Sequence, residues 1–220
     1  PASTMKLVTS LAGLGERVFD PSEKMRVSGK AERLDLTTAL ALSDNDYFKS
    51  PGPRVGAERI IDYGRRLGLG EPTGINYEGE YAGRLPSPRS VASAVNLGFG
   101  EGVEVTPVQL AVLVSALANG GTLLVPKVPL TPQESAGFVP QPRRQLDIPA
   151  GVIGQIIPGM VAAVERGTAS SIGDPGLKVA GKTGTMVNKK SKEASAGIFA
   201  SKQKPTEPTS PTDSGTANPL

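Results

Sequence analysis

The sequence contains no cysteine and no histidine. Thiol nucleophiles, Ser–His–Asp triads and the usual zinc sites are therefore excluded. If the protein carries out acyl-transfer chemistry, its base has to be a lysine, glutamate, aspartate or tyrosine. The absence of cysteine says nothing about the redox compartment, because oxidising and reducing compartments both tolerate it.

Other features are scarce as well. Aromatic residues make up 4% of the chain, and the net charge of +3 is spread out, without a long basic stripe. This composition argues against a dedicated nucleic-acid binder. The longest apolar run, around residues 110–117, is too short to span a bilayer. With 220 residues, the chain has the length of one domain. It begins at Pro1 instead of Met and carries no signal peptide, which suggests that an upstream part is missing.

Local signals predict a mixed helix and strand chain. Asp35 and Thr106 are N-cap candidates, and Pro158 should kink or split the helix that contains it. The predicted helices are 1–15, 35–42, 55–67, 107–118 and 150–166, and the predicted strands are 123–125, 177–185 and 194–200. The last two strands should form a hairpin, whose basic turn we interpret as a solvated loop. Residues 68–90 are predicted to be a long surface loop and 126–147 a proline-rich connection. Residues 1–200 form the predicted domain, and residues 201–220 a disordered tail rich in proline and threonine.

The first helix carries a candidate nucleophile. Ser3 and Lys6 are three residues apart, so both side chains should lie on one face of that helix. A serine at a helix N-terminus lies beside free N–H groups that favour negative charge. An amine one turn further on could activate the hydroxyl. Alone, this pattern is weak, because a solvated helix start with a capping serine would look the same.

Two further motifs follow in order. Ser43-Asp44-Asn45 and Lys182-Thr183-Gly184 complete, with Ser3-x-x-Lys6, the set that marks penicillin-binding proteins and class A β-lactamases. The sequence around the motifs resembles the transpeptidase domain of penicillin-binding proteins over roughly residues 1–200. The matching stretches are 1–6, 69–75, 79–86, 100–111, 118–121 and 181–185.

The resemblance implies a role for each catalytic position. Ser3 would attack the D-Ala-D-Ala carbonyl of a peptidoglycan stem peptide, and Lys6 would be its base. Because a free lysine has a pKa near ~10.4, this role needs a lowered pKa. Ser43 would relay the proton to the departing amine, Asn45 would hold Lys6 and the substrate amide, and Lys182 would supply positive charge. Asp44 is given no role.

The resemblance also implies a substrate-binding segment. Thr183, Gly184 and Thr185 would hold the substrate, with the two threonines on its carboxylate. The backbone N–H groups of Ser3 and Thr185 would form the oxyanion hole. No cofactor and no metal are implied. The implied partners are stem peptides, β-lactams and cell-wall synthesis proteins, at the outer face of the cytoplasmic membrane or in the periplasm, with any membrane anchor in the missing N-terminal part.

The fold that the resemblance implies is α+β, with two lobes: an antiparallel sheet with helices on its faces, and an all-helical lobe beside it. In that family, strands precede the nucleophile helix and others follow the strand 194–200, so an incomplete sheet is expected here. The interval between Ser3 and Ser43 is also short for the family.

Related activities can be weighed from the residues. A class A β-lactamase would carry a Glu-x-x-Leu-Asn loop, which residues 71–76 do not match, so rapid β-lactam hydrolysis is rejected. Residues 79–86 resemble the monofunctional class B enzymes more than the bifunctional class A enzymes. Two alternatives stay open: a non-hydrolysing, penicillin-recognising sensor module and an inactive fragment. The sequence does not separate a role in elongation from one in division.

Overall fold

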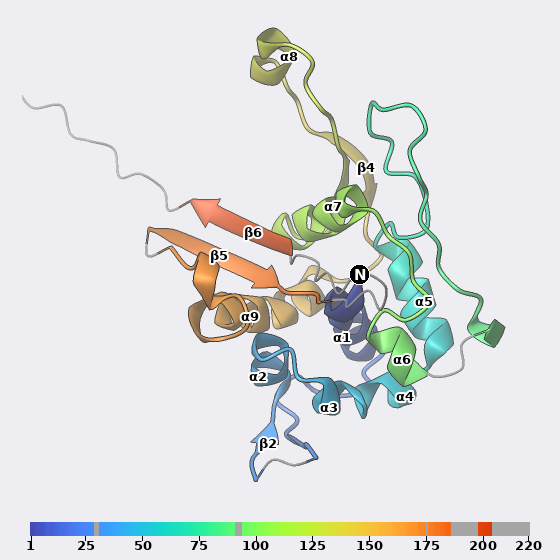
Figure 1. Ribbon diagram of the computed structural model, residues 1–220, viewed down its shortest axis with the longest axis vertical. Coiled ribbons are helices and arrows are strands. Elements are labelled where there is room, and N and C mark those ends of the chain that lie inside the picture. The colour runs from blue at the N-terminus through green and yellow to red at the C-terminus, as the bar shows by residue number, and fades with distance from the viewer. Residues whose placement is uncertain (29–30, 91–93, 175, 186–197, 204–220) are drawn as a thin grey trace, which may run out of the picture.

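One helix lies at the centre of the molecule and the others surround it (Figure 1). The computed structural model describes residues 1–28, 31–90, 94–174, 176–185 and 198–203. The central helix, α1 (Met5–Gly15), is preceded by a 3₁₀ turn over Ala2–Thr4. Every residue from Met5 to Leu14 is buried. A helix that is buried all round must be covered on every side, which explains its central place.

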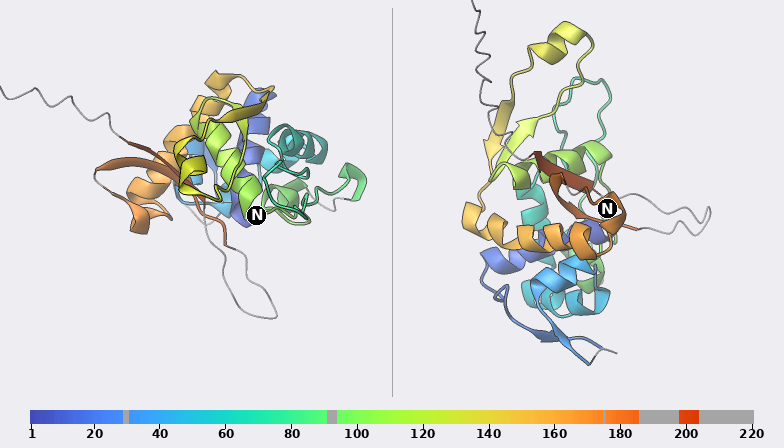
Figure 2. Two further views of the ribbon diagram at one scale, coloured as in Figure 1. Left: turned by 90° about the horizontal axis from the view of Figure 1, so that it is seen from above. Right: turned by 90° about the vertical axis from the view of Figure 1, so that its left-hand side faces the viewer.

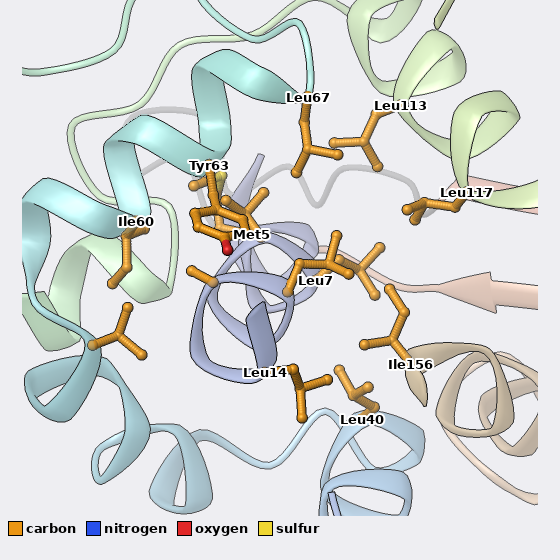
Figure 3. Packing of buried hydrophobic residues seen from close by; sticks show 14 of the residues in the cluster. Met5, Leu7, Leu14, Leu40, Ile60, Tyr63, Leu67, Leu113, Leu117 and Ile156 are labelled. Atoms are coloured by element: carbon orange, nitrogen blue, oxygen red, sulfur yellow. The ribbon is translucent and has the colours of Figure 1, made fainter. Parts of the chain in front are cut away.

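Five further helices pack around α1 (Figure 3). They are α2 (Leu36–Ala41), α4 (Pro51–Val55), α5 (Ala57–Arg66), α6 (Ala94–Gly98) and α9 (Ala150–Arg166). Leu7 and Leu11 are fully buried in this core. The two hydroxyl groups in the middle of α1 are satisfied within the helix, because Thr9 and Ser10 donate to the carbonyls of Met5 and Lys6.

Two short helices carry the chain past the second motif. In α2 (Leu36–Ala41), the predicted cap is confirmed: the Asp35 carboxylate accepts from Thr38 N. The next helix, α3 (Asn45–Phe48), is capped in the same way by Asp44. The helix α2 packs against α9, and a Cβ at Gly159 would lie 2.8 Å from Leu40 Cβ. The close approach of α2 and α9 therefore depends on this glycine.

The helix α7 (Pro107–Ala118) begins at the predicted residue, with a capping box between Thr106 and Gln109. It leads into an arm formed by β3 (Thr122–Val125), α8 (Pro132–Ala136) and β4 (Gln141–Gln145). Figure 2 shows α8 at one end of the molecule and the pair β1 (Met25–Arg26) and β2 (Arg33–Leu34) at the other.

The described strands form three separate antiparallel pairs: β1–β2, β3–β4 and β5–β6. The pair of β5 (Leu177–Lys182) and β6 (Ile198–Gln203) is the predicted hairpin. It packs against α9 through β5 and against α7 through β6 (Figure 1). The α+β prediction is thus confirmed, and the antiparallel sheet of the prediction corresponds to this pair.

Several predicted boundaries were wrong. The helix predicted over 55–67 is α5, which begins only at Ala57, because Gly56, with φ +87°, separates it from α4. The connection 126–147 contains α8 and β4. The helix α9 continues through Pro158. The strand predicted over 177–185 ends at Lys182, and its partner extends to Gln203, past the predicted domain end. The basic turn of the hairpin and the tail beyond Gln203 lie outside the described residues.

Candidate active site

The predicted nucleophile lies at the entrance to α1. Ser3 belongs to the 3₁₀ turn and is partly exposed, whereas Lys6 lies one turn further on, in α1, and is fully buried. The turn is closed by Thr4, whose N–H and hydroxyl both donate to Pro1 O, at 3.2 and 2.7 Å. The helix N-terminus therefore presents Ser3 at the surface while Lys6 points into the protein.

The Lys6 amine is surrounded by oxygen atoms of the second motif. It donates to Ser43 O at 2.6 Å, to Asn45 Oδ1 at 2.5 Å and, more weakly, to Ser43 Oγ at 3.4 Å. The rings of Phe48 and Phe99 each lie with their centroids 5.5 Å from the same amine. Two aromatic faces and two strong acceptors thus fix the position of Lys6 Nζ.

The third motif reaches the same serine from the opposite side. Lys182, the last residue of β5 and fully buried, donates to Ser43 Oγ at 2.7 Å and to Thr183 O at 3.1 Å. The Ser43 hydroxyl therefore lies between the Lys6 and Lys182 amines. A hydroxyl in this place can accept a hydrogen bond from a protonated amine on one side and donate one to a neutral amine on the other.

The backbone at Ser43 places its side chain and its carbonyl together on Lys6. Ser43 has φ +51°, in the left-handed region that is uncommon outside glycine. This conformation ends α2 and starts α3, where the Asp44 carboxylate accepts from Tyr47 N at 2.7 Å. Asp44, which the sequence left without a role, is thus an N-cap, and its charge also acts on Lys6.

Beyond Lys182, the chain packs against the start of the first motif. A Cβ at the buried Gly184 would lie 2.7 Å from Pro1 O and 3.0 Å from Thr4 Cγ2. Only a glycine permits this approach. Thr183 Oγ1 lies 2.7 Å from Thr168 Oγ1, and Thr185 is exposed at the surface. The predicted substrate-binding segment therefore runs directly beside Ser3.

Burial lowers the pKa of both lysines. Desolvation lowers the pKa of Lys6 to about 8, with the charge of Asp44 acting in the opposite direction. Desolvation and the neighbouring Lys6 charge lower the pKa of Lys182 to about 7. Because one hydroxyl connects the two amines, the first proton lost near neutral pH belongs to the pair. The site then holds one positive charge and one neutral amine.

The structure thus brings together Lys6, Ser43, Asn45 and Lys182, which come from three separate motifs. It does not bring Ser3 into the hydrogen-bond network: the Ser3 hydroxyl has no hydrogen-bond partner among the residues that the structure describes. Sequence reasoning missed the contact of the buried Phe48 ring with Lys6. It also missed Phe99 and Thr168, because neither belongs to a motif.

In the described part of the chain, no group of three or more acidic side chains is placed to hold a metal ion. Within the same residues, no helix combines the length and the apolar character needed to cross a bilayer.

The lowered pKa values predict how stability should change with pH. Protonating a lysine costs more in the folded than in the unfolded chain, where the pKa is ~10.4. The two neutral lysines make their full contribution to the free energy of unfolding above pH ~10.4. This contribution is lost as the pH falls through their folded-state pKa values of about 8 for Lys6 and about 7 for Lys182. We therefore expect the melting temperature to rise between pH 6.5 and pH 9, measured by thermal unfolding.

Lys182→Met is the comparison variant for this experiment. It removes one of the two buried amines, and we expect a flatter dependence of the melting temperature on pH. The comparison is needed because burial also lowers the pKa of the Pro1 amino group, which acts in the same direction. An equal slope in the variant would contradict the assigned role of the lysine pair.

Comparison with known proteins supports one family. The family model of the penicillin binding protein transpeptidase domain matches residues 1–208. Stage V sporulation protein D of Bacillus subtilis is 33% identical over 209 residues, which is 84% of this chain and 32% of the relative. The peptidoglycan D,D-transpeptidase MrdA of Salmonella typhimurium is 29% identical over 173 residues, 69% of this chain and 27% of the relative. The chain spans less than a third of either relative's own length.

Solved structures share the fold. Penicillin-binding protein 3 from Mycobacterium tuberculosis, complexed with aztreonam, superposes with a TM-score of 0.71 at 24% identity, over 92% of this chain and 53% of that one. The transpeptidase domain of Burkholderia pseudomallei penicillin-binding protein 3 gives a TM-score of 0.74 at 18% identity, over 91% of this chain and 66% of that one. The match of the family model over 1–208, with the motif residues assembled as described, shows that the chain belongs to the transpeptidase domain family of penicillin-binding proteins.

Proposed function

We propose that this chain is a serine D,D-transpeptidase domain that cross-links peptidoglycan stem peptides through an acyl-enzyme on Ser3. The observation that carries the proposal is the Ser43 hydroxyl held between two buried lysine amines, at 3.4 Å from Lys6 and 2.7 Å from Lys182. This arrangement supplies a neutral amine as base and a hydroxyl as proton relay in a protein without histidine. The relative named as a D,D-transpeptidase supports the reaction class.

The acylation step follows from these roles. Neutral Lys6 takes the proton of the Ser3 hydroxyl while the Ser3 oxygen attacks the carbonyl carbon between the two D-alanines. The N–H groups of Ser3 and Thr185 bind the oxyanion, and such a donor is worth about 3–4 kcal/mol. The C–N bond then breaks. The proton held by Lys6 passes through Ser43 to the departing D-alanine amine, which leaves Lys6 neutral again.

The positive charge that remains in the site, on Lys182, serves to bind the substrate. Lys182, with the hydroxyl groups of Thr183 and Thr185, attracts the terminal carboxylate of the stem peptide. That carboxylate favours the protonated form of Lys182, and a charged Lys182 in turn favours the neutral form of Lys6. The substrate therefore helps to create the base that attacks it. The amine of a second stem peptide then attacks the acyl-enzyme, which forms the cross-link and frees Ser3.

The cellular setting follows from the reaction. Peptidoglycan lies outside the cytoplasmic membrane, so we place the domain at its outer face or in the periplasm. The curated relatives favour a monofunctional, class B parent. Other cell-wall synthesis proteins are the proposed partners, in line with a similar chain solved in a peptidoglycan synthase complex.

The test is turnover on a stem-peptide mimic that ends in D-Ala-D-Ala, with an amino-acid acceptor present. We expect release of D-alanine and a new peptide–acceptor product, detected by mass spectrometry. A mimic ending in L-Ala-L-Ala is the control and should stay intact. Acylation by a penicillin without release of D-alanine would overturn the enzyme proposal in favour of a sensor. A cooperative thermal melt without either reaction would indicate an inactive domain.

A further inference from the structure

Thr168 lies outside all three motifs, yet it contacts two of the segments that carry them. It follows directly after α9 and its closing Gly167. Its hydroxyl lies 2.7 Å from that of Thr183, the residue after Lys182, and 3.5 Å from Ala41 O. Its N–H donates to Ala41 O at 3.1 Å, and Ala41 ends α2, two residues before Ser43. One residue thus touches the chain on either side of the Ser43–Lys182 hydrogen bond.

The backbone around Thr168 has little freedom. A Cβ at Gly167 would lie 2.2 Å from Ala41 O and 2.8 Å from Ala163 Cα, so the end of α9 and the end of α2 are in direct backbone contact. The next residue, Ala169, is 2% exposed and donates to Ala163 O at 2.9 Å. The Thr168 side chain is exposed, but the backbone that carries it is held in place on both sides, by Gly167 and Ala169. The position of its hydroxyl is therefore set by the packing of α9 on α2.

The direction of the Thr168–Thr183 hydrogen bond depends on what Thr183 binds. A carboxylate can only accept, so Thr183 must donate its one hydrogen to it. Thr183 can then only accept from Thr168, whose one hydrogen points to Thr183 at 2.7 Å in place of the longer, 3.5 Å contact with Ala41 O. The result is a chain in which Thr168 donates to Thr183 and Thr183 donates to the carboxylate, and each hydrogen bond in such a chain strengthens the next.

We propose that Thr168 is a positioning residue that orients and polarises the Thr183 hydroxyl toward the carboxylate of the bound substrate or β-lactam. The inference rests on the proposed function, because it takes Thr183 as a carboxylate ligand. Thr168 acts through Thr183 and does not touch the reacting atoms. Its loss should therefore weaken the non-covalent complex and leave the rate of the chemical step largely unchanged.

The experiment is a double-mutant cycle on the 220-residue chain with a fluorescent penicillin. Stopped-flow measurements separate the dissociation constant of the first complex from the acylation rate constant. Thr168→Val keeps the shape and removes the hydroxyl. We expect it to raise the dissociation constant about five- to tenfold, the value of one such hydrogen bond. Thr168→Ser should restore binding. In a Thr183→Val background, Thr168→Val should have no further effect.

Thr122→Val is the matched control. Thr122 also makes a threonine side-chain hydrogen bond near the surface, at 2.9 Å to Gln145, but it lies on the arm. This variant should bind and react like the unmodified chain. Thr168→Ala provides a second replacement if valine lowers the melting temperature.

The outcomes separate the two proposals. If the unmodified chain is not acylated, the proposed function falls, and this inference falls with it. If the unmodified chain is acylated, two results would overturn the inference alone. One is unchanged binding in Thr168→Val. The other is a loss of the same size in the Thr183→Val background.

Discussion

Replacing Ser3 with alanine is expected to abolish the covalent adduct that the unmodified chain forms with a penicillin. The acyl bond needs the Ser3 oxygen, and Thr4, the nearest other hydroxyl in the turn, is buried and donates to Pro1 O. Intact mass after incubation should show one added penicillin per chain for the unmodified protein and none for Ser3→Ala. The melting temperature should change little, because Ser3 is partly exposed.

Ser22→Ala is the control for this experiment. The Ser22 hydroxyl binds the Asp20 carboxylate in an exposed turn away from the three motifs, so this variant should form the full adduct. An adduct that persists in Ser3→Ala would mean that another hydroxyl is the nucleophile. In that case, peptide mapping of the adduct would identify it. Loss of the adduct in both variants would point to misfolding instead of chemistry.

Replacing Lys6 with methionine should reduce the rate of acylation about 10²- to 10⁴-fold, the range for loss of a general base. Methionine fills a similar volume and removes the amine that contacts Ser43 and Asn45. In the unmodified chain, the rate should rise with pH through about 8, as the Lys6 ammonium loses its proton. Lys6→Met should lose this rise along with the rate. The measurement is the second-order rate constant for a fluorescent penicillin between pH 6 and pH 9.

The matched control is Lys49→Met. Lys49 is exposed and pairs with Asp46 on the surface of the same small helical region. Its removal should change neither the rate nor the pH dependence, because exposed ion pairs contribute little. A Lys6→Met variant that keeps the rate and pH profile of the unmodified chain would assign the base to another group. Lys182 would then be the next candidate, since it also contacts Ser43 Oγ.

Local signals were sufficient where a single side chain decides the structure. Asp35 and Thr106 were predicted as N-caps from their position before apolar residues, and both accept the expected backbone hydrogen bond. The Thr106–Pro107 start of α7 depends only on the first turn. Such features need no knowledge of the rest of the fold, so the sequence is enough to predict them.

Other elements depend on tertiary contacts that no local pattern contains. The strand β4 is polar and includes Pro142, so its residues alone predicted a proline-rich connection. It is a strand because it pairs with β3. The helix α9 continues through Pro158, because this proline and Gly154, whose carbonyl loses its helical partner, both face solvent. The strand β5 ends at Lys182, since Gly184 packs on Pro1 and Thr4.

The candidate site also has features that the sequence predicted and features that depend on the tertiary structure. The motif set predicted which residues should meet, and the contacts of Lys6 and Lys182 with Ser43 bring them together. Spacing alone could not have shown this, since Ser43 and Lys182 are 139 residues apart in the chain. The start of the first helix was wrong in detail: Ser3 lies in a 3₁₀ turn, and the α-helix begins at Met5. Phe99 contacts Lys6, and Thr168 contacts Thr183, only through the tertiary structure, so only the folded chain reveals them.

The complete burial of α1 has a consequence for how the reactive serine responds to heat. Segments that open early in native proteins have few buried contacts, whereas Met5 to Leu14 are enclosed on all sides (Figure 3). The helix that supports Ser3 should therefore belong to the most slowly exchanging amides of the chain. It cannot fray without opening the whole core. Reactivity toward a penicillin should consequently persist up to the melting transition and vanish with it in one cooperative step.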